Sequence, residues 1–308
     1  MSKDEIMLAS VAIPTYKGAP FISYVLESLG NQSFKDFEVV IVIKPCGDKT
    51  EDIVRKTCDM LNLQYRILIQ HEGYFTNALN MCLKNAKGDI LLFTDDDAIL
   101  PINWINEHIS EHKRFPRAGA ISGHIIYYDL DSGKFLRSDV ERPLVRVYRR
   151  FLLPTLERPH SLFKDYRQGV YITNTFSVAA GPGIPYKKCL SLPVRGVNMS
   201  FKKEAVEDAQ FPEHPLLKTA PWNEQYIGAQ LVLNGYKSFF NPSLLVYHIL
   251  RKSLSRPEKT FSRYLSSPKP SKEYVRADDL ERKVMRTLFR DLLENIKYGT
   301  KVRRRIFL

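Results

Sequence analysis

The sequence predicts an α/β protein with a mostly parallel sheet flanked by helices. The first observation is that apolar runs alternate with amphipathic segments through the first third of the chain. The second is that these runs are continuous in valine, isoleucine and leucine, as in parallel strands buried on both faces. The third is size: 308 residues, of which 44% are hydrophobic and 26% charged, are typical of a globular protein with a large core.

The elements are expected in strict strand–helix order. Strands are expected at residues 7–13, 37–43, 65–70 and 89–94. Helices are expected between them, at residues 21–32, 48–62 and 74–88. Asp48 and Glu51 have the spacing of a capping box at the start of the second helix, and Gly88 is expected to end the third.

Three consecutive aspartates, Asp95, Asp96 and Asp97, follow the fourth expected strand. Ligands of parallel α/β sheets bind beyond the carboxyl ends of the strands, which is where these carboxylates lie. Side chains alternate along an extended segment, so Asp95 and Asp97 are expected on one side and Asp96 on the other. Two carboxylates on one side suit Mg²⁺ or Mn²⁺. The alternative is an ordinary acidic entry to a loop.

Positive charge is concentrated at the C-terminus. Residues 251–308 hold 17 Lys/Arg against 7 Asp/Glu, a surplus of ten in a chain whose net charge is +12. Within them, residues 279–297 predict an amphipathic helix. Its apolar residues are Leu280, Val284, Leu288, Leu292 and Ile296, flanked by Met285, Phe289 and Leu293. We favour docking of this helix on the rest of the protein; the alternative is an anionic membrane surface contacted through residues 251–308.

The composition also excludes some classes of protein. No apolar run approaches the roughly 20 residues that span a bilayer, and the N-terminus does not read as a signal peptide. The four cysteines show no CxxC spacing, so we expect reduced thiols in a cytoplasmic protein. A nucleic-acid partner is not expected, because it would explain the basic tail but leave the aspartates unexplained.

Four segments resemble successive blocks of family-2 glycosyltransferases. They begin "VAIPTYKGAPF", "NALNMCLKNAKG", "GVNMSF" and "NEQYIGAQ", and together they span about residues 8 to 248, with a weak stretch between about 130 and 190. The resemblance implies the GT-A fold with its Rossmann-like sheet, a nucleotide-sugar donor, Mn²⁺ or Mg²⁺ as cofactor, and inversion at the sugar carbon. The implied acceptor is a hydroxyl of a glycan or a lipid-linked molecule.

The resemblance also assigns the metal site. Asp95 to Asp97 match the family's DXD motif, with Asp97 as metal ligand and Asp95 facing the ribose or the metal. His248, at the end of "LLVYH", matches a histidine near the metal and the diphosphate, and would be a third protein ligand. A structural histidine after an apolar strand is the alternative.

Further positions match the family's donor site. Pro14, Thr15 and Tyr16 match a loop that frames the base, although a plain strand-to-helix turn would use the same residue types. Asn80 matches an asparagine that faces the nucleotide, and a solvated helical asparagine is the alternative. Asn198, in "GVNMSF", is the expected contact on the sugar and acceptor side, and a turn before a strand is the alternative.

The chain departs from the family pattern at two positions. Lys44 lies where the family has an acidic residue that recognises the base, and an ammonium group has no acceptor for the imide hydrogen of uracil. It would approach a base carbonyl or a phosphate, which leaves the donor base open. Glu224 replaces the family's catalytic aspartate, eleven residues before Gly235; a glutamate that only stabilises the start of a helix is the alternative.

We expect three regions along the chain. Residues 1–130 would bind the nucleotide sugar, residues 131–250 would bind the acceptor with an insertion near 131–192, and residues 251–308 would form a basic helical extension that places the protein peripherally on the cytoplasmic membrane face. A polyprenyl-phosphate glycosyltransferase is an alternative, although its ionised acceptor would need no base. A sugar nucleotidyltransferase is a weaker alternative, because "IPTYKGAPF" lacks a Gly- and Arg-rich loop.

Overall fold

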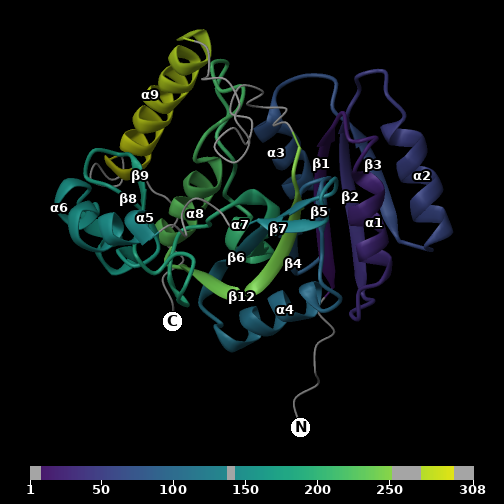
Figure 1. Ribbon diagram of the computed structural model, residues 1–308, viewed down its shortest axis with the longest axis horizontal. Coiled ribbons are helices and arrows are strands. Elements are labelled where there is room, and N and C mark those ends of the chain that lie inside the picture. The colour runs from purple at the N-terminus through teal and green to yellow at the C-terminus, as the bar shows by residue number, and fades with distance from the viewer. Residues whose placement is uncertain (1–7, 137–142, 252–271, 295–308) are drawn as a thin grey trace.

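One large mixed sheet with helices on both faces forms the centre of the protein (Figure 1). The structure is a computed structural model that describes residues 8–136, 143–251 and 272–294. Along the sheet the strand order is β10-β12-β6-β11-β4-β1-β2-β3, and β5 and β7 pair with β12 and β6. The strands are β1 (Ala9–Tyr16), β2 (Phe37–Lys44), β3 (Tyr65–Ile69), β4 (Ile90–Phe93), β5 (Ala98–Ile99), β6 (Ala118–Asp129), β7 (Lys134–Leu136), β10 (Cys189–Leu190), β11 (Met199–Lys202) and β12 (Lys237–Ile249).

The predicted parallel unit of the first third is confirmed. Strand β1 pairs in parallel with β2 and β4, and β2 pairs in parallel with β3. The connecting helices are α1 (Ile22–Gly30), α2 (Thr50–Met60) and α3 (Phe75–Asn85). Strand residues alternate between two cores, so Val11 and Ile13 face α1, α2 and α4 (Trp104–Arg114), whereas Ala12 faces α3 and α8 (Asn223–Leu233).

Two local expectations in this unit were wrong. Pro14, Thr15 and Tyr16 are not a loop but the end of β1, paired with β2. Proline is tolerated there because β4 pairs with β1 only as far as Ala12, so the missing N–H of Pro14 removes no bond to β4. The capping box is also absent: the helix starts at Thr50 with Lys49 at the N-cap, so Asp48, which accepts hydrogen bonds from Thr50, lies before the cap, and Glu51 pairs with Arg55.

The second half of the chain completes the same sheet. Strand β11 inserts antiparallel between β4 and β6, and β12 runs parallel to β6. The sheet is therefore continuous across the sequence position near residue 130 where we divided donor and acceptor halves. The short helix α7 (Lys203–Val206) follows β11 and packs with α8 on the α3 side of the sheet.

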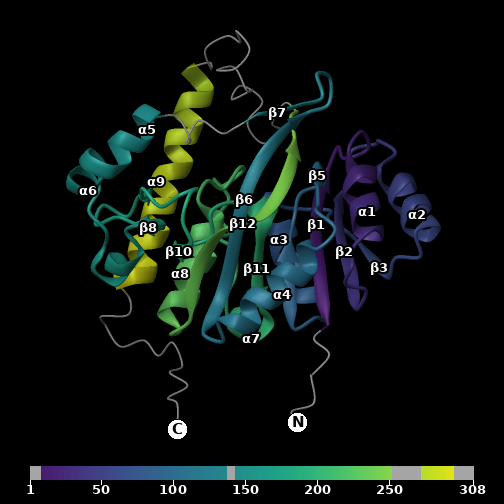
Figure 2. The same ribbon diagram turned by 60° about the horizontal axis from the view of Figure 1, so that its bottom comes forward.

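A smaller lobe covers the β10–β12 end of the sheet. It contains α5 (Pro143–Val147), a short π-helix (Tyr148–Leu152), α6 (Leu153–Leu156), a 3-10 helix (Ser161–Tyr166), and the hairpin of β8 (Val170–Ile172) and β9 (Val178–Ala180). In both Figure 1 and Figure 2 this lobe and α9 (Lys272–Glu294) lie at the opposite end of the molecule from β3 and α2. Among the described helices, none is long and apolar enough to cross a bilayer.

The expected docking of the C-terminal helix is confirmed; Val284, Leu288 and Leu292 pack against the core as predicted but are only partly buried. Met285, Phe289 and Leu293, which we treated as flanking residues, are almost fully buried against the lobe and α8. Leu280, placed by us on the buried face, keeps 47% of its surface exposed. The remaining part of the prediction, from Ile296 through the basic tail, lies outside the described residues, as do residues 252–271.

Candidate active site at the carboxyl edge of the sheet

A short antiparallel bridge forms the acidic cluster. After β4 ends, β5 pairs with the end of β12, and this pairing sets His248 opposite Ala98. The backbone N–H of Ile249 also donates to the carbonyl of Asp97, at 2.8 Å. Two segments that are 151 residues apart in sequence are thereby held side by side, and the cluster is built into the sheet instead of lying on a free loop.

The three predicted metal ligands, Asp95, Asp97 and His248, converge at this bridge. Nε2 of His248 is 2.7 Å from Oδ1 of Asp97 and 3.6 Å from Oδ2 of Asp95. One ligand atom from each of the three residues can be chosen so that all lie within 4.8 Å of one another. Two carboxylate oxygens and an imidazole nitrogen are a donor set that fits Mn²⁺, and the carboxylates also fit Mg²⁺.

Asp96 points away from these ligands, as the alternation of an extended chain predicts. Its Oδ2 accepts a hydrogen bond of 2.5 Å from the hydroxyl of Thr15 at the end of β1. Its Oδ1 is 2.6 Å from Nη2 of Arg251. Thr15 therefore belongs to the site, but as a partner of Asp96.

Arg251 is a site residue that the sequence analysis missed. Its guanidinium contacts both Asp96 and Asp97, and it stacks over the ring of Phe21 with a distance of 5.1 Å to the centroid. Three adjacent carboxylates, of which Asp96 and Asp97 are buried, require positive charge nearby, and Arg251 is the first cation after "LLVYH". The need for a cation beside the three aspartates was therefore the sequence signal that could have identified Arg251.

The environment separates the ionisation of the three carboxyl groups. Burial, and then the charge of Asp97, raises the pKa of Asp95 to about 7, and burial raises that of Asp96 to about 6. Burial also acts on Asp97, but His248 and Arg251 outweigh it and lower the pKa of Asp97. The His248 pKa is raised, because the charge of Asp97 outweighs the burial of the ring. Asp97 is therefore the carboxylate that stays ionised most readily.

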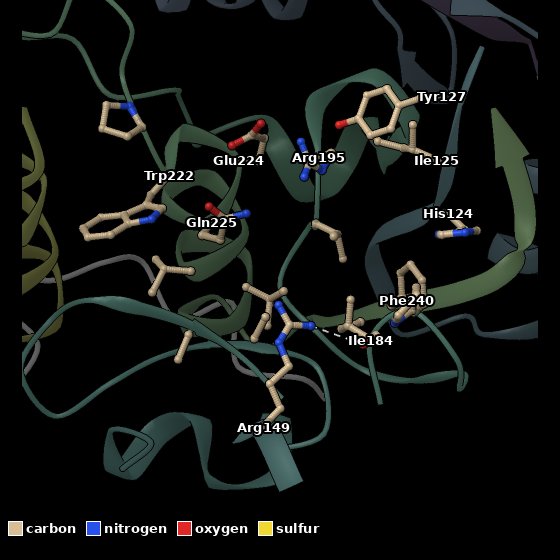
Figure 3. A pocket seen from close by; sticks show the side chains of 18 of the residues that line it. His124, Ile125, Tyr127, Arg149, Ile184, Arg195, Trp222, Glu224, Gln225 and Phe240 are labelled. Carbon is tan, nitrogen blue, oxygen red and sulfur yellow. Dashed lines mark hydrogen bonds between the residues drawn. The ribbon is translucent and has the colours of Figure 1, made fainter. Parts of the chain in front are cut away.

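A cavity of about 310 Å³ lies beside the cluster (Figure 3). Tyr127 of β6 lines it, and the ring of Tyr127 is 5.7 Å from the ring of His248, so the cavity and the cluster adjoin. Polar and charged side chains from five parts of the chain line the rest of the cavity. They include His124, Arg149, Arg195, Glu224, Gln225 and Arg282.

Glu224 projects into this cavity from the first turn of α8 (Figure 3). Its Oε1 accepts a hydrogen bond of 3.1 Å from the backbone N–H of Gly196. The loop before α8 is sharply turned, with Ala220 and Trp222 in the left-handed region at φ of 44° and 67°. Such a loop needs support from outside to keep its shape.

Helix α9 supplies that support through one buried carboxylate. Oε2 of Glu281 accepts from the N–H of Thr219 at 3.0 Å, from its hydroxyl at 2.8 Å, and from the N–H of Ala220 at 2.9 Å. Glu281 keeps only 5% of its surface exposed. Glu281 therefore fixes the loop that leads into α8.

Two predicted donor contacts are structural residues instead. Asn198 is fully buried: its carbonyl accepts from Trp104 and is hydrogen bonded to His108, and its amide donates to the carbonyls of His124 and Leu244. No hydrogen-bonding capacity is left for a donor. The amide of Asn80 is likewise occupied, because it exchanges hydrogen bonds with the backbone of Phe211. Both asparagines join distant backbone segments, which their local sequence does not reveal.

The other predicted donor residues lie at the same edge of the sheet. Tyr16 pairs with Lys44 across β1 and β2, and Tyr16 is 40% exposed. Lys44 donates to the carbonyl of Gly73 at 2.5 Å, and its Nζ lies 5.5 Å from the centre of the Tyr74 ring. These side chains form an aromatic and cationic group at the ends of β1 and β2, outside the acidic cluster.

Comparisons with known proteins agree on the type of protein. Residues 10–177 match the sequence profile of the family described as "Glycosyl transferase family 2". The chain is 38% identical over 94 residues to the poly(ribitol-phosphate) beta-N-acetylglucosaminyltransferase TarS of Staphylococcus aureus, a match that covers 30% of this chain and 16% of TarS. It is 26% identical over 132 residues to glycosyltransferase GlyG of Streptococcus pneumoniae, covering 42% of each chain. The matched parts are thus less than half of these relatives.

Solved structures show the same fold. The mannosyltransferase PcManGT from Pyrobaculum calidifontis, in complex with GDP-Man and Mn²⁺, superposes with a TM-score of 0.55 at 17% identity, covering 96% of this chain and 76% of that one. GalNAc-T7 with UDP, GalNAc and Mn²⁺ superposes with a TM-score of 0.60 at 14% identity, covering 89% and 48%. The expected GT-A fold is confirmed.

Proposed function

Because the chain belongs to glycosyl transferase family 2 and has the GT-A fold, we propose that it is a metal-dependent, inverting glycosyltransferase that moves a sugar from a nucleotide-sugar donor to a hydroxyl of a glycan or lipid-linked acceptor. One observation carries the proposal: the acidic cluster and the cavity with Glu224 adjoin at Tyr127. A site for a leaving group and a site for an attacking group are thus side by side.

The donor diphosphate belongs at the acidic cluster. Asp95, Asp97 and His248 would hold Mn²⁺ or Mg²⁺, which when bound offsets the negative charge that develops on the leaving diphosphate. The Mn²⁺ in the two superposed structures supports this choice. Arg251 adds positive charge from the opposite side of Asp97.

The nucleoside belongs at the ends of β1 and β2. Tyr16 offers an aromatic surface and Lys44 offers hydrogen-bond donors to a base carbonyl or a phosphate. Thr15 holds Asp96 in place through its 2.5 Å hydrogen bond.

The acceptor belongs in the cavity. Its hydroxyl oxygen attacks the sugar carbon on the face opposite the diphosphate: the new C–O bond forms as the bond to the diphosphate breaks, and the configuration inverts. Glu224 takes the hydroxyl proton, a contribution typically worth ~10² to 10⁴ in rate. The N–H of Gly196 donates to Oε1 and so helps to fix the orientation of this carboxylate.

The cations of the cavity favour an acceptor that carries phosphate. Among the described residues, no carboxylate forms an ion pair with Arg149 or Arg195. Burial and the neighbouring charge of Arg195 lower the pKa of Arg149. A bound anion would therefore stabilise the charged form of Arg149. The relative TarS is named for action on poly(ribitol-phosphate), which supports the same class of acceptor.

The test is a thermal-shift screen of the full chain against UDP-, GDP- and dTDP-sugars and duplex DNA, each with Mn²⁺ and with EDTA. We expect one nucleotide-sugar class to raise Tm in Mn²⁺ and to lose that effect in EDTA, because the cluster needs the ion to bind a diphosphate. Stabilisation by DNA alone, or full sugar transfer in EDTA, would contradict the proposal.

A further inference from the structure

The segment from α5 to α6 exposes an unusual number of large apolar side chains. Five of them lie within 13 residues and are more than half exposed: Leu144 (84%), Val147 (54%), Phe151 (65%), Leu152 (54%) and Leu156 (66%). We call these five residues the apolar ridge. Tyr148, at 39%, lies among them. Contiguous exposed apolar surface of this kind marks an interaction site, whereas single exposed residues do not.

The ridge is the outer face of a segment whose inner face is firmly seated. Leu153 is 6% exposed and packs in the core formed by the lobe, α8 and α9. Arg149 donates to the carbonyl of Ile184 at 3.3 Å and lines the acceptor cavity (Figure 3). Arg149 and Leu153 are four residues apart and therefore share one side of the helical segment. The apolar ridge occupies the other side.

The charges of the segment indicate what the ridge contacts. Residues 143–156 contain three arginines and no carboxylate. Arg150 is exposed and stacks on Phe151 of the ridge, at 5.7 Å from its ring centre. Aliphatic and aromatic residues bordered by arginine and tyrosine are typical of helices that lie in the interface of an anionic bilayer.

The position of the segment favours a lipid surface over a peptide or a protein groove. In both Figure 1 and Figure 2, α5 and α6 lie at the outer edge of the molecule, with no labelled element beyond them. A projecting apolar edge can enter a soft lipid surface without a partner of matching shape. In α9, the other amphipathic segment, Met285, Phe289 and Leu293 are buried within the protein.

We propose that the apolar ridge docks the protein on an anionic lipid surface. The same turn that carries Phe151 outward carries Arg149 inward, so docking brings the acceptor cavity close to the lipid headgroups. This last step rests on the proposed function and restricts the acceptor to one held at a membrane; the docking itself does not depend on it.

The first test is sedimentation of the full chain with vesicles of phosphatidylglycerol and phosphatidylcholine, at low salt. We expect the double variant Phe151→Glu/Leu156→Glu to bind at least about tenfold less than wild type, because it places charge in the apolar layer. The matched control is Met60→Glu, which changes an equally exposed residue (65%) of α2 at the far end of the sheet and should bind as wild type does. Arg150→Gln should weaken binding to the anionic vesicles.

A second measurement reads the ridge directly. Leu144→Trp should show a blue-shifted tryptophan emission on addition of the same vesicles, whereas Met60→Trp should not, because only the first side chain enters the lipid. Several results would overturn the proposal: wild type that does not bind anionic vesicles, a double variant that binds as well as wild type, or concentration-dependent dimerisation that the double variant abolishes. The last result would assign the ridge to a second copy of the chain.

The outcome is separable from the proposed function. Stabilisation by nucleotide sugars is measured without vesicles and should be equal in wild type and in Phe151→Glu/Leu156→Glu. Failure of vesicle binding with intact donor stabilisation would reject the docking alone. Vesicle binding without any donor stabilisation would reject the glycosyltransferase assignment and leave the docking in place.

Discussion

Replacing Glu224 by glutamine is the sharpest test of the proposed chemistry, because the substitution removes the carboxylate while keeping the shape of the side chain. The carboxylate makes a 3.1 Å hydrogen bond from Gly196 N–H to Oε1, and the amide oxygen of glutamine can accept the same bond. The side chains are nearly equal in size, so packing at the cavity wall is preserved. What is lost is the ability to take a proton, since an amide nitrogen is a donor.

The expected effect follows from that single loss. Turnover in sugar transfer should fall by ~10² to 10⁴, which corresponds to about 2.7 to 5.4 kcal/mol in activation free energy. Donor affinity should be unchanged within about twofold, because the proposed site of the diphosphate is the acidic cluster and not the cavity that Glu224 lines. The assay is steady-state transfer to acceptor, paired with donor titration in Mn²⁺.

Two further variants serve as a comparison and a control for Glu224→Gln. Glu224→Asp keeps a carboxylate but withdraws it by about a bond length, so its turnover should lie between wild type and Glu224→Gln. Glu294→Gln changes an exposed carboxylate at the end of α9 and should behave as wild type. Normal turnover in Glu224→Gln would refute the reasoning: the acceptor would then be already ionised, or another group would be the base.

Four other predictions follow from the site and the core. Asp97→Asn should abolish the Mn²⁺-dependent rise in Tm on donor binding while the far-UV circular dichroism is retained, and a persisting rise would remove Asp97 from the metal site. Lys44→Ala should weaken donor affinity with little change in turnover; unchanged affinity in calorimetric titration would leave Lys44 only its bond to the backbone. Burial lowers the pKa of His108 to about 4 and that of His112 to about 3, so the unfolded chain binds more protons just below pH 6.5. The contribution of these two histidines to stability should therefore be complete above about pH 6.5 and fall as pH drops toward 4, by about 1.4 kcal/mol per pH unit for each histidine. Because the raised pKa values of Asp95 and Asp96 act in the opposite direction over the same range, the measurement compares urea unfolding of wild type and His108→Gln/His112→Gln, and equal pH slopes in the two would contradict the prediction. Phe289→Ala should cost about 3–5 kcal/mol of unfolding free energy in urea, whereas a negligible cost would mean that α9 is not docked in solution.

The parts of the fold that were predictable are those set by neighbouring residues. Each strand of the parallel unit is a continuous apolar run, and each helix repeats its apolar residues every three or four positions, so both patterns are complete within one segment. The aspartates were assigned to the correct edge for the same reason, because strand ends in such a sheet meet at one side.

What failed depended on partners distant in sequence. Asn80 and Asn198 looked available because their sequence neighbours do not reveal the backbone segments they bind, 131 and 46 residues away for Phe211 and Leu244. The buried stripe of α9 was misplaced because its apolar residues cover a broad face of the helix. Glu281 contributes to the choice of stripe by binding the backbone of Thr219 and Ala220.

The bond from Glu281 to residues 219 and 220 also bears on how the protein matures during synthesis. Glu281 is added 57 positions after Glu224, which takes roughly 3–11 s at the usual rates of translation. Until then, the left-handed turn ahead of α8 lacks the carboxylate that holds it. The strands that carry the aspartates are made before Glu281, whereas the proposed base gains its supported position only after Glu281 has been added. On the proposed function, a nascent chain would thus gain its donor-binding residues before the residue that activates the acceptor hydroxyl is supported.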